Sequence, residues 1–329
     1  MQTLDGKQMA SSFSTGEKAT PSKNGKLQVK EGKLCDESGK TVQLRGMSTH
    51  GLSWYPLYVN QAFFTQLANE WNCNVIRLAM YTAELDGYCE GGDQEGLRQI
   101  IREGVAYAKK ADMYVIIDWH ILLDFDPNTN KKDALAFFDS MSEEFKDENH
   151  VIYEICNEPN KGCDWKAVKE YANEVIPVIR SHAKDAVILV GTPTWSQDVD
   201  EALADPITGF DNLMYTFHFY AATHKDELRK KLKDAVDGGL PVFVSEYGLC
   251  AADGSGVIDK EESKKWISLL NENDISYLAW NISYKKETSA IFKPDRPKYQ
   301  DLGWDDLTEY GKVVFSVLTK NSVETEEKE

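Results

Sequence analysis

The sequence contains no run of 18 or more apolar residues, so nothing in it predicts a membrane-spanning helix. It also has no GxGxxG or GxxxxGK[ST] motif after its first strand-like segment, which argues against the common nucleotide-binding α/β folds. Its six cysteines form no CxxC pair and no Cys/His cluster with zinc spacing. We therefore expect no metal site and no membrane insertion.

Basic residues are scarce: 37 Lys and Arg stand against 54 Asp and Glu, which gives a formal net charge of -17. Such a chain repels the phosphate backbone of nucleic acid, whose binders carry clustered Lys and Arg. The charge does not repel a neutral polymer such as a polysaccharide. Acidity therefore excludes nucleic acid as a partner without naming another one.

Both ends of the chain are polar and lack periodicity. We expect residues 1–25 to be a disordered leader, without the apolar h-region of a signal peptide, and residues 321–329 to be a polar tail. No Pro/Gly/Ser-rich linker interrupts residues 26–320, which predicts a single domain. Cys73 and Cys156 fall in or beside apolar segments and are expected to be buried thiols, while a disulfide among the other four cysteines stays open.

Short apolar, β-branched segments alternate with amphipathic stretches of helical period. An initial hairpin is expected near residues 26–46, with ESGK (37–40) as its turn. Eight strands should follow, at residues 42–48, 74–80, 114–120, 151–158, 187–193, 213–220, 242–248 and 277–283. Helical stretches separate them, and LTEYGKVVFSVL (307–318) is expected to close the ring. Eight such units predict an α/β fold, a (β/α)8 TIM barrel with a short N-terminal β-hairpin.

Polar residues gather at the carboxyl ends of these strands, which form the active-site mouth of a barrel. One of them alone could be structural, for example as a buried ion-pair partner. Their joint placement is harder to explain by packing. The residues are Arg77, Asp118, Trp119, His120, Asn157, Glu158, His218, Tyr220, Glu246 and Trp280.

Two glutamates, Glu158 and Glu246, end the fourth and seventh strands. Glycosidic cleavage needs an acid for the leaving oxygen and a second carboxylate on the other face of the sugar. Strands four and seven lie across an eight-stranded ring from each other, so the two side chains can meet at its mouth. A separation of about 5–5.5 Å implies retention of configuration and roughly 6.5–9.5 Å implies inversion.

At these residues the chain resembles glycoside hydrolase family 5 of clan A, most closely the bacterial endo-β-1,4-glucanases (cellulases). The resemblance covers residues 26–320, and its most specific piece is the NEP triplet in VIYEICNEPN (151–160). Further matching segments are LRGMSTHG (44–51), NVIRLAMY (74–81), VIIDWHIL (115–122), GTPTWSQDVD (191–200), HFYAATH (218–224) and VSEYG (244–248).

The resemblance implies a retaining, endo-acting mechanism without a cofactor, with Glu158 as general acid/base and Glu246 as nucleophile. It implies that Arg77 and Tyr220 keep Glu246 charged, that His218 helps keep Glu158 protonated, and that Asn157 holds the sugar 2-hydroxyl. Other residues should line the substrate cleft: His50 and His120 in the −1 subsite, Trp280 as its floor, and Trp54, Tyr81, Trp119 and Trp195 as further glucose platforms. Trp165 and Trp266 are expected to be core residues.

The chain departs from the family pattern at Leu123, Phe125 and Tyr284, bulky groups expected to overhang the cleft. These departures put substrate preference in question. Xyloglucan, mixed-linkage glucan, mannan and xylan therefore stay open as substrates beside a β-1,4-glucan polymer or oligosaccharide. An engineered or non-catalytic carbohydrate-binding barrel and a metal-dependent barrel hydrolase are the alternatives from other classes. The family also suggests secretion or attachment to a cell surface, and we expect a monomer.

Overall fold

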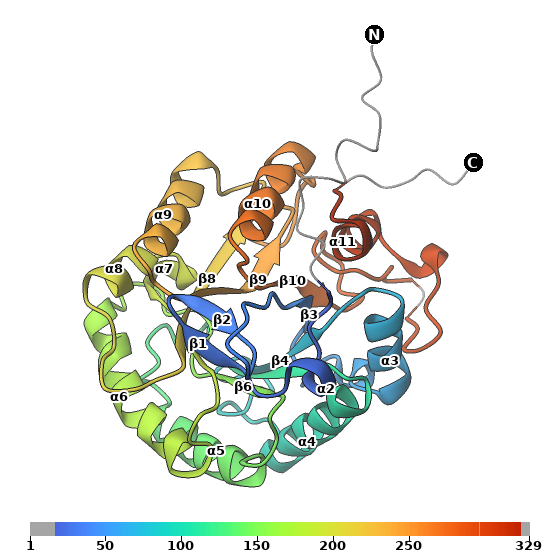
Figure 1. Ribbon diagram of the computed structural model, residues 1–329. Helices are drawn as coiled ribbons and strands as arrows, with labels where there is room; N and C mark the ends of the chain where they lie inside the picture. The colour runs from blue at the N-terminus through green and yellow to red at the C-terminus, as the bar shows by residue number, and fades with distance from the viewer. Residues whose placement is uncertain (1–16, 296, 324–329) are drawn as a thin grey trace.

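Eight parallel strands close into a barrel surrounded by helices in the computed structural model, which describes residues 17–295 and 297–323 (Figure 1). Neighbouring strands follow the order β10-β3-β4-β5-β6-β7-β8-β9, which confirms the predicted (β/α)8 barrel. The strands are β3 (Arg45–Thr49), β4 (Val75–Tyr81), β5 (Tyr114–His120), β6 (Val151–Glu154), β7 (Ile188–Val190), β8 (Leu213–Tyr220), β9 (Val242–Gly248) and β10 (Tyr277–Ile282). Each coincides with a predicted segment, but β6 ends at Glu154 and so leaves Glu158 on the loop that follows.

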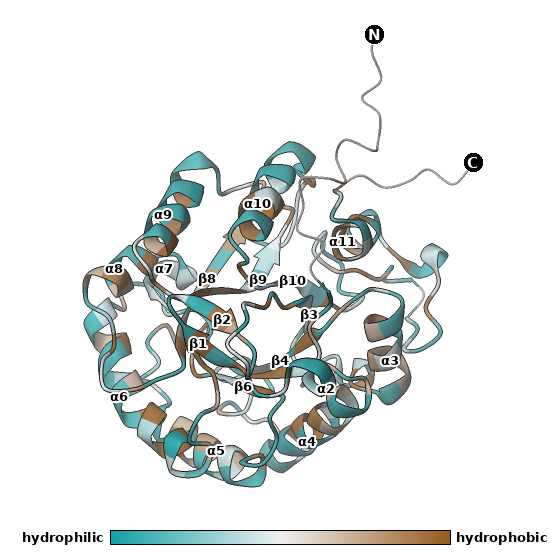
Figure 2. Cartoon of the chain, viewed as in Figure 1, coloured by the Kyte–Doolittle hydropathy of each residue, from teal (hydrophilic) through white to brown (hydrophobic). Residues whose placement is uncertain are grey.

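Helices alternate with the strands and present their apolar faces to the barrel, with their polar faces outward (Figure 2). Several begin at a side-chain cap: Asp93, Asp164 and Asp259 each accept a hydrogen bond from the backbone N–H three residues further on. None of the helices in the described ranges is long and apolar enough to cross a bilayer. The helices are α2 (Pro21–Asn24), α3 (Gln61–Asn69), α4 (Gln94–Lys110), α5 (Lys131–Glu144), α6 (Trp165–His182), α7 (Pro193–Ser196), α8 (Val199–Ala204), α9 (Asp226–Asp237), α10 (Lys260–Glu272) and α11 (Glu309–Lys320), with 3-10 turns η1 (Pro56–Tyr58) and η2 (Trp304–Asp306).

The N-terminal hairpin of β1 (Gln28–Lys30) and β2 (Lys33–Cys35) lies across the amino-terminal end of the barrel (Figure 1). Leu27 and Leu34 join a buried cluster with residues that start the barrel strands, such as Val75. The predicted turn was misplaced: Glu31 and Gly32, both at positive φ, connect the two strands, because a two-residue hairpin turn requires that conformation. ESGK makes the next turn instead.

The barrel domain includes residues before the predicted boundary at residue 26. Ala19 is buried, α2 forms, and Ser22 donates two hydrogen bonds to Asp112 in the loop after α4. The segment from residue 17 is therefore part of the domain, since its short apolar and capping residues find partners that local periodicity could not reveal. Residues 1–16 of the leader predicted over residues 1–25 lie outside the described residues.

Side chains alternate strictly between the two faces of most barrel strands. On β4, Val75, Arg77 and Tyr81 point to the interior, whereas Ile76 and Leu78 join the core between strands and helices. On the inner face, the polar side chains therefore lie nearer the mouth, and the buried apolar cluster that includes Val75 lies at the amino-terminal end. This alternation brings distant parts of the sequence together at the mouth.

Strand β9 carries a β-bulge at the site. Thr216 on β8 pairs with Phe243, but His218, two residues later, pairs with Glu246, three residues later on β9. The additional residue places both Ser245 and Glu246 toward the interior, where each makes buried hydrogen bonds.

Candidate active site

Arg77 forms the centre of a buried charge cluster inside the mouth of the barrel. Its guanidinium donates two hydrogen bonds to Glu154 (2.7 and 3.2 Å) and one to Glu246 (3.1 Å). It also contacts Asp118 Oδ2 at 3.0 Å and donates to Asn157 Oδ1 at 2.6 Å. Arg77 is completely buried, which suits a role in holding these side chains in place.

The two predicted carboxylates do meet at the mouth. Nearest ligand atoms of Glu158, His218 and Glu246 all lie within 4.8 Å of one another. Glu246 accepts a hydrogen bond from the Tyr220 hydroxyl at 2.7 Å in addition to the one from Arg77. Its position is thus fixed by two donors.

Glu158 has a different environment. Its Oε1 lies 2.8 Å from Nδ1 of His218, whose Nε2 lies 2.9 Å from the hydroxyl of Ser245. Arg77 donates no hydrogen bond to Glu158 within the described part of the chain. The acid with the cationic neighbour is Glu246, and the acid with the imidazole neighbour is Glu158.

These environments separate the pKa values of the two acids. Burial raises the pKa of Glu158 to about 8, with Arg77 opposing the shift and Asp118 and Glu154 adding to it. Burial also raises the pKa of Glu246, to about 7, although His218, Arg77 and Tyr220 lower it. Arg77 and Tyr220 therefore act on Glu246 in the expected direction, toward the charged form, while burial acts against them. Glu246 still loses its proton before Glu158 does.

Five of the predicted cleft residues form one aromatic cluster beside the carboxylates. His50 lies 5.1 Å from Trp280 and stacks on Tyr81 at 5.8 Å, both between ring centroids. Trp54 packs on Tyr81 at 4.8 Å, and His120 stacks on Trp280 at 5.3 Å. The structure thus brings His50, Trp54, Tyr81, His120 and Trp280 together as one wall of the mouth.

The two remaining tryptophans of the predicted cleft differ. Trp119 is completely buried between β5 and the helices, against Phe137 and Phe138. Its prediction as a glucose platform is wrong, because Asp118 and His120 occupy the inner face and the residue between them must point outward. Trp195 is 43% exposed, and its backbone N–H donates to Pro159 on the Glu158 loop.

Trp165 and Trp266 are both buried, as expected of core residues. The six cysteines are all free thiols, so the disulfide that the sequence left open is absent from the structure.

The three departures from the family pattern fall into two kinds. Leu123 is 52% exposed on the loop after β5, and Phe125, at a φ of 62°, has the Lys161 ammonium 3.7 Å from its ring centre. Tyr284 does not overhang the cleft as an isolated group: its ring packs edge-on against Tyr55, 5.2 Å between centroids, and it lies against the core. Of the three residues, Leu123 is the exposed one, and Phe125 and Tyr284 are both partly buried.

The sequence placed Asp118 at the mouth without a specific role and did not single out Glu154 or Ser245; all three lie behind the two carboxylates and hold the site residues in place. Glu154 carried the same signal that singled out Arg77, a charge within an apolar strand, and Asp118 did as well. Ser245 carried no signal, because only the bulge turns it inward. These three residues position the groups that the sequence did identify.

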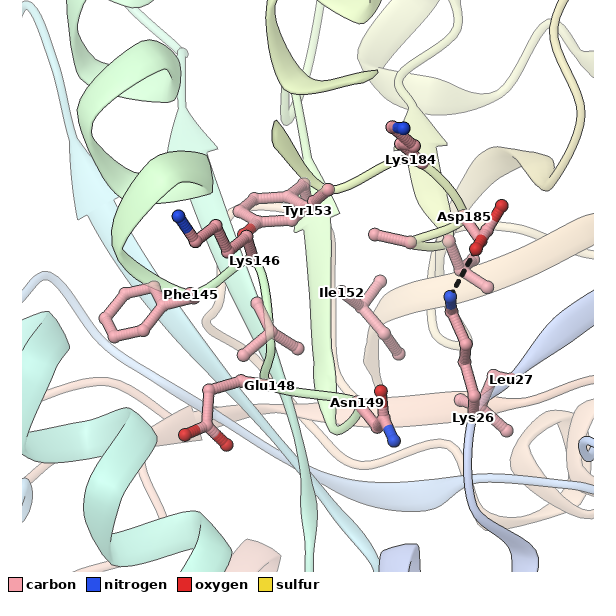
Figure 3. Close-up of a pocket in the computed structure, with 14 residues that line it drawn as sticks. Lys26, Leu27, Phe145, Lys146, Glu148, Asn149, Ile152, Tyr153, Lys184 and Asp185 are labelled. Atoms are coloured by element: carbon pink, nitrogen blue, oxygen red, sulfur yellow. Dashed lines mark hydrogen bonds and ion pairs between the residues drawn. The ribbon is translucent and has the colours of Figure 1, made fainter. Parts of the chain in front are cut away.

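A hollow at the other end of the barrel is unrelated to this chemistry (Figure 3). Its lining includes Ile152, near the start of β6, and the Lys26–Asp185 ion pair at 2.5 Å. Both lie at the amino-terminal end of the strands, which in barrels of this type serves stability.

Comparison with known proteins gives one family. Residues 35–286 match the family described as Cellulase (glycosyl hydrolase family 5). Endoglucanase A of Butyrivibrio fibrisolvens is 50% identical over 288 residues, which cover 87% of this chain and 66% of that protein. The chain thus spans just under two thirds of that relative's length.

Solved structures agree with the barrel. Cellulase Cel5C_n superposes with a TM-score of 0.88 at 42% identity, covering 93% of this chain and 96% of that one. The catalytic domain of Thermobifida fusca endoglucanase Cel5A, in complex with cellotetraose, gives a TM-score of 0.85 at 37% identity, covering 92% and 100%.

Proposed function

Because this chain belongs to the cellulase family, glycosyl hydrolase family 5, we propose that it is a retaining, endo-acting hydrolase of β-1,4-glucans. One observation carries the mechanism: carboxylate oxygens of Glu158 and Glu246 approach within 4.8 Å. That limit is close to the separation of about 5–5.5 Å in retaining enzymes and below the roughly 6.5–9.5 Å of inverting ones.

In the first step, Glu246 attacks the anomeric carbon while Glu158 protonates the leaving oxygen. Glu246 is suited to attack because it loses its proton first, and Arg77 and Tyr220 aim its two oxygens. Glu158 is suited to donate because burial raises its pKa to about 8. The products are a glycosyl–Glu246 ester and a freed sugar hydroxyl.

In the second step, the Glu158 carboxylate takes a proton from water, which attacks the ester carbon and releases Glu246. Two inversions leave the anomeric configuration unchanged. The aromatic wall of His50, Trp54, Tyr81, His120 and Trp280 offers apolar faces to the C–H surface of a pyranose ring.

A substrate panel tests the assignment. Reducing ends released from carboxymethylcellulose, lichenan, xyloglucan, xylan and mannan should appear chiefly with carboxymethylcellulose, with lichenan second, since the cellotetraose-bound relative is a β-1,4-glucan binder. Glu158→Gln and Glu246→Gln should both abolish the signal. Higher rates on xyloglucan, xylan or mannan would replace the glucan assignment. If the parent protein and both variants were inactive on every substrate, a non-catalytic barrel would be favoured.

The pH profile of kcat/KM should be bell-shaped, with its optimum between pH 7 and 8. The ascending limb reports loss of the proton from Glu246, pKa about 7, which creates the nucleophile. The descending limb reports loss of the proton from Glu158, pKa about 8, which removes the acid. Both apparent values belong to the interacting pair.

An aryl cellobioside with an activated leaving group separates the two limbs. Since that leaving group needs no protonation, Glu158→Gln should keep the ascending limb and lose the descending one in single-turnover kinetics. A descending limb that persists in this variant would assign it to another group.

Chelation should leave the rate unchanged. Within the described residues, one cluster of carboxylate and imidazole side chains is close enough to hold a cation: Glu158, His218 and Glu246. Arg77 Nη1, however, lies 3.1 Å from Glu246. A cation there would face the guanidinium charge. Dialysis against EDTA followed by the carboxymethylcellulose assay checks this, and a loss reversed by a divalent metal would support the metal-dependent alternative.

We propose further that the protein works as a monomer outside the cell or at its surface. A polymeric glucan cannot enter a cell intact, and each barrel carries a complete pair of carboxylates. Light scattering at assay concentration tests the monomer, and cell fractionation with the encoded full-length protein tests the location.

A further inference from the structure

We propose that Ser245, held by Glu154, is a positioning residue that fixes the tautomer of His218 so that its Nδ1 can only accept a hydrogen bond from Glu158. The inference rests on the proposed function for its catalytic consequence, but its structural part stands on hydrogen-bond directions and on the burial of His218. It assigns a role to two buried residues that touch no substrate.

A chain of hydrogen bonds, here called the relay, joins Glu158 to His218, Ser245 and Glu154 in that order. Which partner donates in each bond is determined at the Glu154 end. Oε2 of this carboxyl accepts from Arg77 Nε at 2.7 Å, and Oε1 accepts from Arg77 Nη2 at 3.2 Å, with both side chains completely buried. Burial raises the pKa of Glu154 and the guanidinium lowers it. A carboxyl whose two oxygens both accept from one guanidinium is a charged carboxylate, which has no hydrogen to donate.

Ser245 transmits this direction to His218. The Ser245 hydroxyl lies 2.7 Å from Glu154 Oε1 and gives that oxygen its one hydrogen. The same hydroxyl lies 2.9 Å from His218 Nε2, toward which it has only lone pairs left. Nε2 must therefore carry a hydrogen.

His218 is neutral, because burial lowers its pKa to about 4, with Glu246 and Glu154 raising it and Arg77 lowering it. A neutral imidazole with its hydrogen on Nε2 has a bare lone pair on Nδ1. Glu158 Oε1 lies 2.8 Å from Nδ1. Because Nδ1 can only accept, a hydrogen bond between these two atoms forms only when Glu158 is protonated. The relay thus stabilises the acid form of Glu158.

The same arrangement helps the second step. Once Glu158 has given up its proton, its carboxylate faces the Nδ1 lone pair instead of a hydrogen, which favours taking a proton from the attacking water. The opposite tautomer would donate to the carboxylate and lower the pKa of Glu158, so that less of Glu158 is protonated for the first step and its carboxylate is a weaker base in the second.

Replacement of Ser245 can test this cleanly because it alters no charge. The charged and titratable groups facing Glu158 and His218 are Arg77 and Tyr81 on β4, Asp118 and His120 on β5, Glu154 on β6, Tyr220 on β8 and Glu246 on β9. All of them remain in Ser245→Ala. Thr216→Val is the matched control, since the Thr216 hydroxyl is buried on the neighbouring strand without a hydrogen-bond partner in the described part of the chain.

The first measurement is the 15N spectrum of the histidine rings in the intact protein, with His218 assigned by its absence from His218→Asn. The parent and Thr216→Val should show the Nε2–H tautomer, and Ser245→Ala should show Nδ1–H in its place. This readout needs no activity, so it separates failure of the relay from failure of the proposed function. Nδ1–H in the parent, or an unchanged tautomer in Ser245→Ala, would overturn the proposal.

The second measurement is the pH profile of kcat/KM on cello-oligosaccharides. The descending limb should move to lower pH by about one unit in Ser245→Ala and stay in place in Thr216→Val. Ser245→Thr, which keeps the hydroxyl, should restore both tautomer and limb. A uniform loss of rate in Ser245→Ala with an unmoved limb would mark Ser245 as a packing residue only.

Discussion

Glu246→Ala is expected to lower kcat on carboxymethylcellulose by roughly four orders of magnitude or more, the scale seen when a covalent nucleophile is removed. No other described carboxylate can replace it: Glu154 and Asp118 are bound to Arg77 and have no exposed surface. The fold should survive, because Arg77 keeps these two partners and the cluster loses one of its three negative charges.

Azide distinguishes loss of the nucleophile from general damage. With a dinitrophenyl β-cellobioside donor, azide can occupy the space of the Glu246 side chain and attack directly, giving the glycosyl azide of inverted configuration. Proton NMR of the product reads the anomer. Glu170→Ala, which removes an exposed carboxylate from α6, should behave as the parent does. An azide product of retained configuration in Glu246→Ala would move the nucleophile elsewhere.

The barrel could be predicted from the sequence because its signal is local. Each strand is a short apolar run buried on both faces. Charged residues inside such runs, Arg77 and Glu246 among them, cost free energy to bury unless they are paired, so they indicate a functional site. The pairing of Glu158 with Glu246 then follows from topology, since strands four and seven of a closed ring face each other across it. The structure adds their proximity.

Some features of the site could not be predicted from the sequence, because they depend on the face to which individual side chains point and on the hydrogen bonds that they receive. Trp119 looked like a site residue because it lies between two that are, but the period of two turns it outward. Ser245 looked like an outward residue for the same reason, and the bulge turns it inward. The protonation order of Glu158 and Glu246 likewise depends on the hydrogen bonds that each receives, which no spacing in the sequence encodes.

Glu158→Ala should separate the two chemical steps by their dependence on the leaving group. On carboxymethylcellulose, whose leaving sugar needs a proton, kcat/KM is expected to fall about 100- to 10,000-fold, the usual contribution of a general acid. On a dinitrophenyl β-cellobioside the first step needs no acid and should keep its rate, while the second step slows for lack of a base. Stopped-flow absorbance should then show a burst of one dinitrophenolate per enzyme, followed by slow turnover with a lowered KM.

Added azide should accelerate that slow phase, because the anion needs no base to attack the glycosyl–Glu246 ester. It reaches the ester from the face that Glu158 occupied, so its product should have retained configuration, opposite to that of Glu246→Ala. His218 loses its partner at Nδ1 in this variant but keeps Ser245 at Nε2, so the wall and the nucleophile should stay in place. Equal losses on both substrates, without a burst, would mean that Glu158 acts in neither proton transfer. Opposite azide anomers from the two variants can arise only if the two carboxylates work on opposite faces of the same sugar.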